Sequence, residues 1–462
     1  MTTEELEQWA DSFAAFHARF APLFHRRETR EQAAKYLRGL LAPLERKNGW
    51  QLAEALGDAT PDRTQRLLYR AGWDADAARD VLQRFVIETF GDPEGIGVVD
   101  ETGFLKKGAA SVGVQRQYSG TAGKVENCQV ATVLTYATRR GHVFLDRRLY
   151  LPESWARDPE RRARAEVPPG VPFQTKPEQA VAMLEHAWRQ GVPMRWVTGD
   201  EVYGDAPYLR AAIERAGRRY VLAVSSTTPV WPLPLALGAG AAPPPASTVA
   251  AVVASWPAEA WQRLTVAEGE KGPRTYDWAC GRVVDRREGQ PGRELWLLAR
   301  RALSDPGELA YYLGHAPRDT PLVTLARVAA TRYTVEQCIE EAKGEAGLDQ
   351  YEVRRWHSWH RHLTLALMAH TWLAAVRAEA AEKGGPTRSW RRCRCRRCGA
   401  CWRWRCRCRP APWRCGWPGR AGGAPSGCGC GRVTIGSEHG QPRQHATLLI
   451  LGELSTVVVL GR

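Results

Sequence analysis

The stretch Gly97-Val-Val-Asp100-Glu-Thr-Gly-Phe104 places acidic residues directly after a short apolar run. The stretch Trp196-Val-Thr-Gly-Asp200 repeats this arrangement further along the chain. Because a buried strand of an α/β sheet presents its ligand-binding groups where it ends, both stretches predict a strand that delivers an aspartate to the sheet edge. Either aspartate taken alone is better explained as a strand-terminal residue that caps a turn.

The segments around these two stretches alternate between strand and helix patterns. Residues 129–136 and 142–151 are rich in β-forming residues, whereas residues 176–190 carry apolar side chains at helical spacing. Asp205 is placed to cap a further helix that ends at Gly217, and residues 219–224 follow as another strand pattern. Strands followed by strand–helix alternation predict an α/β fold with a mixed sheet.

The N-terminal segment has the apolar periodicity of helices. Thr60 predicts an N-cap, with Pro61 at the first position of a helix that follows a short helix at residues 50–56. Two short helices joined by a tight turn resemble a helix-turn-helix, whose second helix enters the major groove of DNA. A helical bundle with a solvated basic face is the alternative. The second helix carries the candidate DNA contacts Arg63, Arg66 and Arg70.

A third acidic candidate, Glu336, lies in a segment with helical spacing. Arg332, Glu340 and Lys343 fall on the same stripe of that helix. Such a stripe is ordinarily a solvated face, but here it combines a carboxylate with two cations suited to DNA phosphates.

Phosphodiester cleavage explains why three separated acids are of interest. Two divalent ions about 4 Å apart can supply the nucleophile and neutralise the phosphoryl oxygens when carboxylates hold the ions. Mg²⁺ prefers oxygen ligands and keeps several waters, so a few acids suffice. Asp100, Asp200 and Glu336 are therefore the candidate metal ligands, with Mg²⁺ as the expected ion and Mn²⁺ as a substitute.

Three longer blocks of sequence resemble the catalytic blocks of bacterial insertion-sequence DDE transposases, in the same order. The first block is Val99–Phe104 with Gln115–Gln129, and the second is Val197–Gly204. The third is Val335–Arg354, followed by Trp356–His362. Three ordered blocks are far more specific than scattered acids, and the resemblance runs over roughly residues 10–380.

This resemblance implies an RNase H-like core with a β insertion before the helix that bears Glu336. It implies cut-and-paste chemistry, in which Mg²⁺-dependent cleavage at the element ends precedes attack of the freed 3′-hydroxyl on target DNA. Asp100, Asp200 and Glu336 are then the catalytic, metal-holding residues, and Arg332 and Lys343 contact the DNA backbone. The implied partners are the terminal inverted repeats and target DNA, bound by a homodimer in the synaptic complex.

The third block departs from the family in one place. The related pattern is Tyr-x2-Arg-x3-Glu-x6-Lys, and Arg332, Glu336 and Lys343 occupy its last three positions. The tyrosine position falls on Ala329, so no tyrosine contact is expected there.

These patterns divide the chain into five segments. Residues 1–92 are predicted to form a helical DNA-binding domain, and residues 93–224 the first part of the RNase H-like catalytic core. Residues 225–328 form a β-rich insertion, and residues 329–384 supply the C-terminal helices of the core. Residues 385–462 form an anomalous tail rich in Arg, Cys and Trp.

The tail accounts for most of the unusual composition. The net charge is +15, but the tail alone carries 15 Arg, no Lys and 2 Glu, so the rest of the chain is nearly neutral. Nine of the 12 cysteines also lie in the tail. A frameshift near residue 386, or a disordered tail, explains this composition. A zinc-binding or basic tail is the alternative, because Cys395, Cys398 and Cys401 have the spacing of metal ligands.

The remaining expectations concern location and competing functions. The start of the chain lacks a signal-peptide pattern and no run is long enough for a membrane helix, so a cytoplasmic, nucleoid-associated protein with no membrane partner is expected. An inactive, transposase-derived DNA-binding protein is the main alternative. A phosphatase with Asp100 as its nucleophile is disfavoured, because Thr102 stands where a second Asp is usual. A transition-metal site at His357, His360 and His362 is disfavoured against packing or DNA contact.

Overall fold

A mixed β-sheet forms the centre of the protein, in a computed structural model that describes residues 3–235, 243–269, 272–305, 307–383, 391–393 and 401–403. Five of the six core strands are ordered β4–β3–β1–β5–β6 across the sheet, and the short strand β2 pairs with β3. Strands β4, β3 and β1 are antiparallel, whereas β5 and β6 run parallel to β1. This order and direction define an RNase H-like core, which confirms the predicted fold class. The strands are β1 (Gly95–Leu105), β2 (Gln115–Ser119), β3 (Lys124–Thr138), β4 (Gly141–Tyr150), β5 (Met194–Gly199) and β6 (Arg219–Val224).

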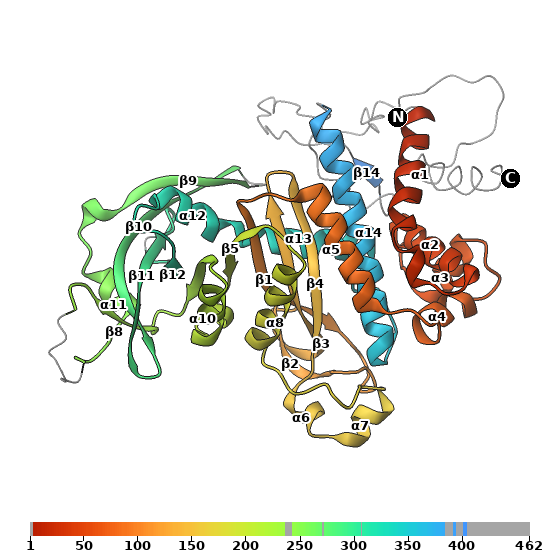
Figure 1. The fold of residues 1–462 in the computed structure, drawn as a ribbon, viewed down its shortest axis with the longest axis horizontal. Helices are drawn as coiled ribbons and strands as arrows, with labels where there is room; N and C mark the ends of the chain where they lie inside the picture. The colour runs from red at the N-terminus through yellow and green to blue at the C-terminus, as the bar shows by residue number, and fades with distance from the viewer. Residues whose placement is uncertain are drawn as a thin grey trace, which may run out of the picture.

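Helices cover both faces of this sheet (Figure 1). Successive strand residues point to opposite faces, so Val98 packs into the hydrophobic cluster with helices α13 and α14, whereas Val99 packs with helix α8. Each face of β1 is therefore buried, which explains the continuous apolar run before Asp100. The helices of the core are α6 (Glu153–Ala156), α7 (Pro159–Arg164), α8 (Lys176–Arg189), α9 (Glu201–Gly204), α10 (Pro207–Arg215), α12 (Leu322–Thr331), α13 (Tyr333–Ala346) and α14 (Trp356–Glu382).

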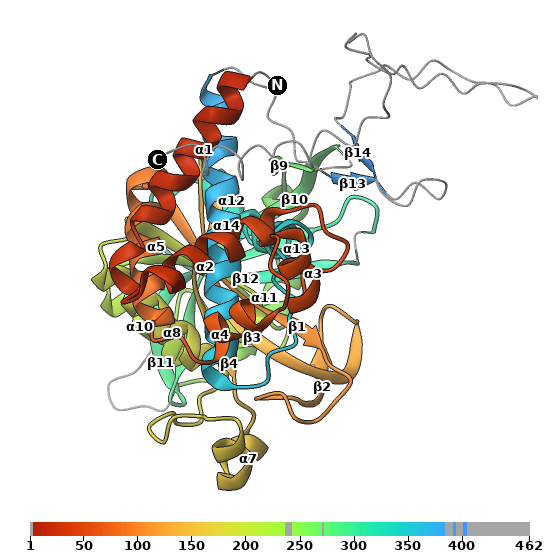
Figure 2. The ribbon, with the colours of Figure 1, turned by 90° about the vertical axis from the view of Figure 1, so that its right-hand side faces the viewer.

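The N-terminal helices pack around the long helix α14, as the side view shows (Figure 2). A buried hydrogen bond of 2.8 Å joins the Tyr36 hydroxyl to Nδ1 of His362 on α14. The helical reading of this segment is confirmed. Its elements are α1 (Thr3–Ala18), η1 (Ala21–Leu23), α2 (Arg27–Leu41), α3 (Gly49–Ala55), α4 (Asp62–Tyr69) and α5 (Ala75–Phe90).

Two predicted helix caps are wrong. Pro61, not Thr60, occupies the N-cap of α4, and the Thr60 hydroxyl donates to the Asp62 carboxylate instead of accepting from a backbone amide. Helix α10 begins after Ala206 without a side-chain cap, because the Asp205 carboxylate accepts hydrogen bonds from Ser225 and Thr228. In both cases the local sequence pattern suggested a helix cap, but the side chain forms its hydrogen bonds with other side chains or with a more distant segment.

The β-rich insertion continues the central sheet. Strand β12 pairs antiparallel with β6, with Leu313 opposite Leu222, and β11 and β10 follow outward. Core and insertion thus share one hydrogen-bonded sheet of 12 strands among the described residues. The elements of the insertion are β7 (Pro229–Pro232), β8 (Ser247–Thr248), α11 (Val249–Ala254), η2 (Ala258–Ala260), β9 (Gln262–Gly269), β10 (Gly272–Arg287), β11 (Gln290–Arg301) and β12 (Leu309–His315).

Little of the tail belongs to the described residues. Strands β13 (Arg391–Cys393) and β14 (Cys401–Arg403) form a separate antiparallel pair. The zinc and frameshift hypotheses concern residues such as Cys395 and Cys398, which lie outside the described part of the chain. In that described part, no helix combines the length and apolar character needed to cross a membrane.

Candidate active site

The register of two parallel strands brings Asp100 and Asp200 together. Val99 on β1 pairs with Gly199, the last residue of β5, so Asp100 in the middle of β1 lies beside Asp200, which follows β5. Asp100 accepts a 2.7 Å hydrogen bond from the Glu101 amide, and Asp200 caps helix α9 by accepting 3.0 Å from the Val202 amide. The prediction for Asp200 is confirmed, since it directly follows the end of β5. The prediction that the first strand ends at Asp100 is wrong, because β1 continues to Leu105 through its pairing with β3. The two aspartates nevertheless lie side by side, although they are far apart in sequence.

A tight turn fixes the position of Asp200. Helix α9 packs so closely on β6 that a Cβ at Gly204 would lie 1.7 Å from the carbonyl oxygen of Ala223. Only glycine fits this approach. The short helix that Asp200 caps is thereby held against the sheet, which accounts for the glycine at the end of the second sequence block.

Burial and like charge raise the pKa of both aspartates. Burial, followed by the nearby Asp200 carboxylate, raises the pKa of Asp100 to about 7. Burial, followed by Glu101, raises the pKa of Asp200 to about 6. Buried carboxylates that repel one another are characteristic of functional sites, because a cation or a proton is needed to relieve the repulsion.

Glu101 is a fourth acid of this site that the sequence analysis did not single out. Its carboxylate forms an ion pair with Lys176 on α8 and accepts a 3.0 Å hydrogen bond from the buried Tyr203 hydroxyl. The only sequence signal was its position beside Asp100, which on an ordinary strand would turn it to the other face. The Lys176 and Tyr203 contacts come from distant segments and could not be read from local spacing.

Arg332 lies between the aspartate pair and Glu336. Its Nη1 atom is 3.0 Å from the Glu336 carboxylate and 3.8 Å from the Asp100 carboxylate. The Glu336 side chain, in the first turn of α13, is 56% exposed. Arg332 therefore connects Glu336 to Asp100, which lies beside Asp200, whereas the sequence analysis had suggested that Arg332 faces DNA.

Lys343 attaches helix α13 to the strand that carries Asp100. Its Nζ atom donates to the Gly103 carbonyl at 3.2 Å and to the Thr121 hydroxyl at 3.0 Å. Burial lowers the pKa of Lys343. The predicted DNA-contacting ammonium is thus engaged with the protein and adjacent to the acidic site.

The donor set fits a divalent ion of the magnesium type. In the described ranges, no three Asp, Glu, His or Cys side chains are grouped closely enough to hold a metal ion. Glu336 is paired with Arg332. Mg²⁺ is commonly held by only one or two carboxylates together with waters and substrate phosphates. Asp100 and Asp200 supply such a pair. Burial and, after it, neighbouring negative charge raise the pKa of both carboxyl groups, and a bound cation would offset both effects.

The other sequence candidates lie away from the acids. Arg63, Arg66 and Arg70 are exposed on one side of α4, opposite the buried Thr64 and Leu67. Residues 56–61 separate α3 from α4, a longer connection than the tight turn expected for a helix-turn-helix.

Two of the three histidines near the start of α14 pack against the rest of the protein, whereas His357 is exposed. Burial lowers the pKa of the half-buried His360 to about 3. His362 is buried between Tyr36 and the Gly347 carbonyl. The predicted alternatives to a metal site were packing or DNA contact. The contacts of His360 and His362 agree with packing, and DNA contact stays a prediction for the exposed His357.

Comparison with known proteins identifies the family. Residues 19–273 match the model of the DDE superfamily endonucleases. That match covers more than half of the chain, so the protein belongs to this family. The acids Asp100 and Asp200 both lie within the matched residues, and Glu336 lies beyond them.

A curated relative is described as "Probable transposase for insertion sequence element IS701" from Microchaete diplosiphon. It is 28% identical over 206 residues, which are 44% of this chain and 51% of the relative. The chain thus matches about half the length of that protein.

Two solved structures show distant similarity. A piggyBac transposase in a synaptic complex with hairpin DNA aligns with a TM-score of 0.38 and 12% identity, over 83% of this chain and 75% of that one. The NurA nuclease from Sulfolobus solfataricus aligns with a TM-score of 0.21 and 10% identity, over 67% of this chain and 92% of that one. These scores are too low to support a shared function.

Proposed function

We propose that this protein is an insertion-sequence transposase that cuts DNA at the ends of its element and joins the freed ends to target DNA. The observation that carries the proposal is the neighbouring pair of buried aspartates, with Asp100 in the middle of β1 and Asp200 at the end of the parallel strand β5. Family membership and the similarity to the IS701 protein support the same reaction class.

In this proposal Asp100 and Asp200 hold Mg²⁺ or Mn²⁺, and Glu336 completes the set. When bound, the ions activate the attacking hydroxyl and neutralise charge on the phosphoryl group. Arg332 holds the carboxylates of Glu336 and Asp100 close to each other, and its guanidinium provides a positive charge for the DNA phosphate. Lys176 and Tyr203 hold Glu101 beside the pair, and its charge keeps the site attractive to cations.

The DNA partners are the terminal inverted repeats and the target, bound by two copies of the chain in a nucleoid-associated synaptic complex. Residues 1–92 and the exposed arginines of α4 supply the proposed contact to the element ends. Lys343 supports this surface by fixing α13 to β1 and is proposed to lie near the DNA backbone.

A cleavage assay tests the reaction. A labelled duplex that spans the element end is incubated with the protein in Mg²⁺, in Mn²⁺ and in EDTA. We expect nicking at one position with either ion and none in EDTA. Asp200→Asn should abolish nicking, since the amide oxygen still caps α9 but the charge needed for metal binding is lost. Asp11→Asn, at an exposed position on α1, is the matched control and should cut normally.

The outcomes separate the alternatives. Specific binding without nicking in any metal would support the inactive DNA-binding derivative. Equal nicking by wild-type protein and Asp200→Asn would contradict the proposed site.

The α4 arginines give a separate prediction for DNA binding. We expect replacement of Arg63, Arg66 and Arg70 by Gln to weaken binding and to reduce the slope of log K against log salt by up to about 2.7, because each lost phosphate contact contributes about 0.9. Salt titrations of the binding constant measure this slope. The control variant changes Arg157, Arg189 and Arg215, which are exposed on other elements. Equal slopes for the two triple variants would place the DNA contact elsewhere.

A further inference from the structure

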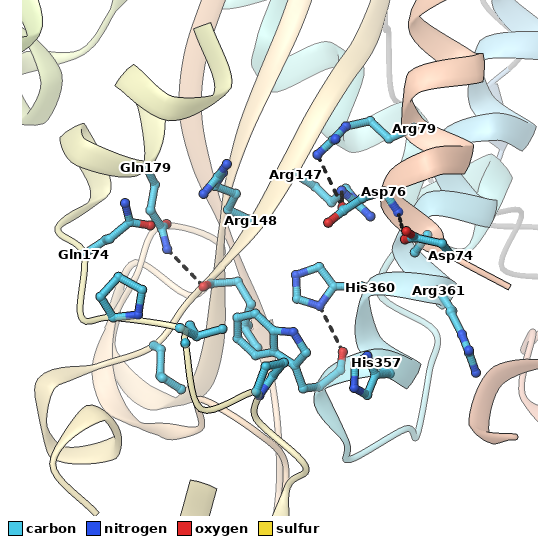
Figure 3. Close-up of a pocket in the computed structure, with 18 of the residues that line it drawn as sticks. Asp74, Asp76, Arg79, Arg147, Arg148, Gln174, Gln179, His357, His360 and Arg361 are labelled. Carbon is cyan, nitrogen blue, oxygen red and sulfur yellow. Dashed lines mark hydrogen bonds and ion pairs between the residues drawn. The ribbon is translucent and has the colours of Figure 1, made fainter. Parts of the chain in front are cut away.

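A cavity of about 710 Å³ lies at the outer edge of β4, and none of the proposed catalytic acids lines it (Figure 3). Its walls come from the start of α5, from β4, from the segment before α8 and from the first turn of α14. In the described chain β4 pairs with β3 alone, so its other edge is free of strand partners. The volume falls within the range of pockets that hold small ligands.

Arg147 is the unusual residue of this cavity. Its side chain is 1% exposed, and its Nη1 atom donates to Asp76 at 2.9 Å and to Asp146 at 3.3 Å. Its Nε and Nη2 atoms are buried without a hydrogen-bond partner among the described residues. A buried guanidinium with unused donors is costly, and such a group calls for an ion, a water or a ligand as its partner.

The surroundings favour an anion as that partner. Arg148 also lines the cavity, its Nε atom is buried without a partner, and no described carboxylate lies within ion-pair distance of it. Burial lowers the pKa of Arg148. The cavity lining contains four arginines but only two acids: Arg79, Arg147, Arg148 and Arg361 against Asp74 and Asp76.

The two central arginines reach the cavity from opposite sides of one strand. Arg147 and Arg148 are consecutive on β4, so their side chains leave opposite faces of the sheet edge. Figure 3 shows Arg147 beside Asp76 and His360, and Arg148 on the side of Gln179. A ligand at this edge would meet the unused Arg147 fork from one side and the positive charge of Arg148 from the other.

We propose that this cavity binds a phosphoryl group, carried by a small phosphorylated molecule or by a DNA strand. The unused Nε and Nη2 donors of Arg147 form the planar fork that pairs with two phosphate oxygens. Arg148 contributes the second positive charge, and the carboxylates of Asp76 and Asp146 orient Arg147 from behind. This site is separate from the acidic site, so it needs no catalytic step.

Calorimetry on the full chain in EDTA tests the proposal with inorganic phosphate and dAMP as probes. We expect saturable binding and a higher melting temperature with each probe. Arg148→Gln should weaken binding about ten-fold, the scale of one charge-assisted hydrogen bond. Because Arg148 has no described ion-pair partner, this variant should melt like the wild-type protein. Arg189→Gln, an exposed change on α8, is the matched control and should bind normally.

Competition identifies the source of the phosphoryl group. A short single-stranded oligonucleotide that displaces dAMP, and fails to do so when its linkages are neutral methylphosphonates, would assign the site to a DNA strand. Binding of phosphate and dAMP without displacement by the oligonucleotide would assign it to small phosphorylated molecules. Absence of saturable binding, or equal affinity in wild-type protein, Arg148→Gln and Arg147→Lys, would overturn the proposal. Since catalysis is not measured, these results do not depend on the cleavage assay.

Discussion

Asp100→Asn is expected to abolish DNA cleavage while making the metal-free protein more stable at pH 8. Cleavage should fall by about 10³-fold or more, as when an essential charge-stabilising group is removed. The stability gain follows from the pKa of Asp100, which burial and Asp200 raise from 3.8 to about 7. Its carboxylate is ionised above that pH despite the unfavourable surroundings, and a neutral amide removes this cost.

The stability of the metal-free wild-type protein is expected to fall as pH rises. A raised carboxyl pKa means that the folded state binds the proton more tightly than the unfolded state, so wild-type stability falls as pH rises from about 4 to about 7. The difference from Asp100→Asn should be near zero below pH 4 and reach at most about 4 kcal/mol above pH 7, for a shift of roughly three pKa units. Urea unfolding of both proteins in EDTA at several pH values measures this difference in stability.

Metal provides the internal control for this prediction. Adding Mg²⁺ at pH 8 should stabilise the wild-type protein and leave Asp100→Asn nearly unchanged. The difference in unfolding free energy between the two proteins should therefore become smaller. Asp11→Asn should behave as wild type throughout. A variant that loses stability at pH 8 in EDTA would show that the ionised Asp100 carboxylate is not strained by its surroundings.

Asp285→Ala is expected to destabilise the protein by about 3–5 kcal/mol, the cost of breaking a buried ion pair. Asp285 on β10 is fully buried, accepts 2.8 Å from Nε of Arg287 and 2.6 Å from the Arg293 amide, and lies 3.6 Å from Arg210 of α10. Its removal leaves the nearly buried Arg210 guanidinium without a carboxylate partner. It also removes the ion pair between Asp285 and Nε of Arg287. Chemical unfolding with this variant measures the loss.

The surface pair Arg19–Glu88 provides the comparison. Its atoms are 2.6 Å apart, but the side chains are 42% and 55% exposed, so Glu88→Ala should cost about 1 kcal/mol or less. Similar losses for Glu88→Ala and Asp285→Ala would show that burial does not set the value of the Asp285 network.

Several features of the site could be predicted because their signals are local. Strand β6 and helix α8 begin and end within one residue of the predicted bounds. The apolar runs before Asp100 and Asp200 predicted that both aspartates lie at one edge of the sheet, and the parallel register places them side by side. The continuation of β1 beyond Asp100 to Leu105 was not predicted. The family resemblance added the order of the blocks and the third acid.

The features that could not be predicted depend on contacts between distant segments. Glu101 joins the acidic site through Lys176 and Tyr203, and Arg332 faces Asp100 as well as Glu336. Thr60 and Asp205 both occupy positions where a cap is plausible, but each side chain found another partner. The unused donors of Arg147 likewise become visible only when β4 is placed at the sheet edge beside α5 and α14.

The pairing of β12 with β6 has a mechanical consequence. The strand of Asp200 is next to β6, so an uninterrupted ladder of hydrogen bonds connects the acids to the outermost strands of the insertion. A hinge between the two parts would have to break that ladder. The two aspartates and the insertion therefore belong to one continuous sheet, and a change in their relative position requires deformation of that sheet rather than rotation about a flexible linker.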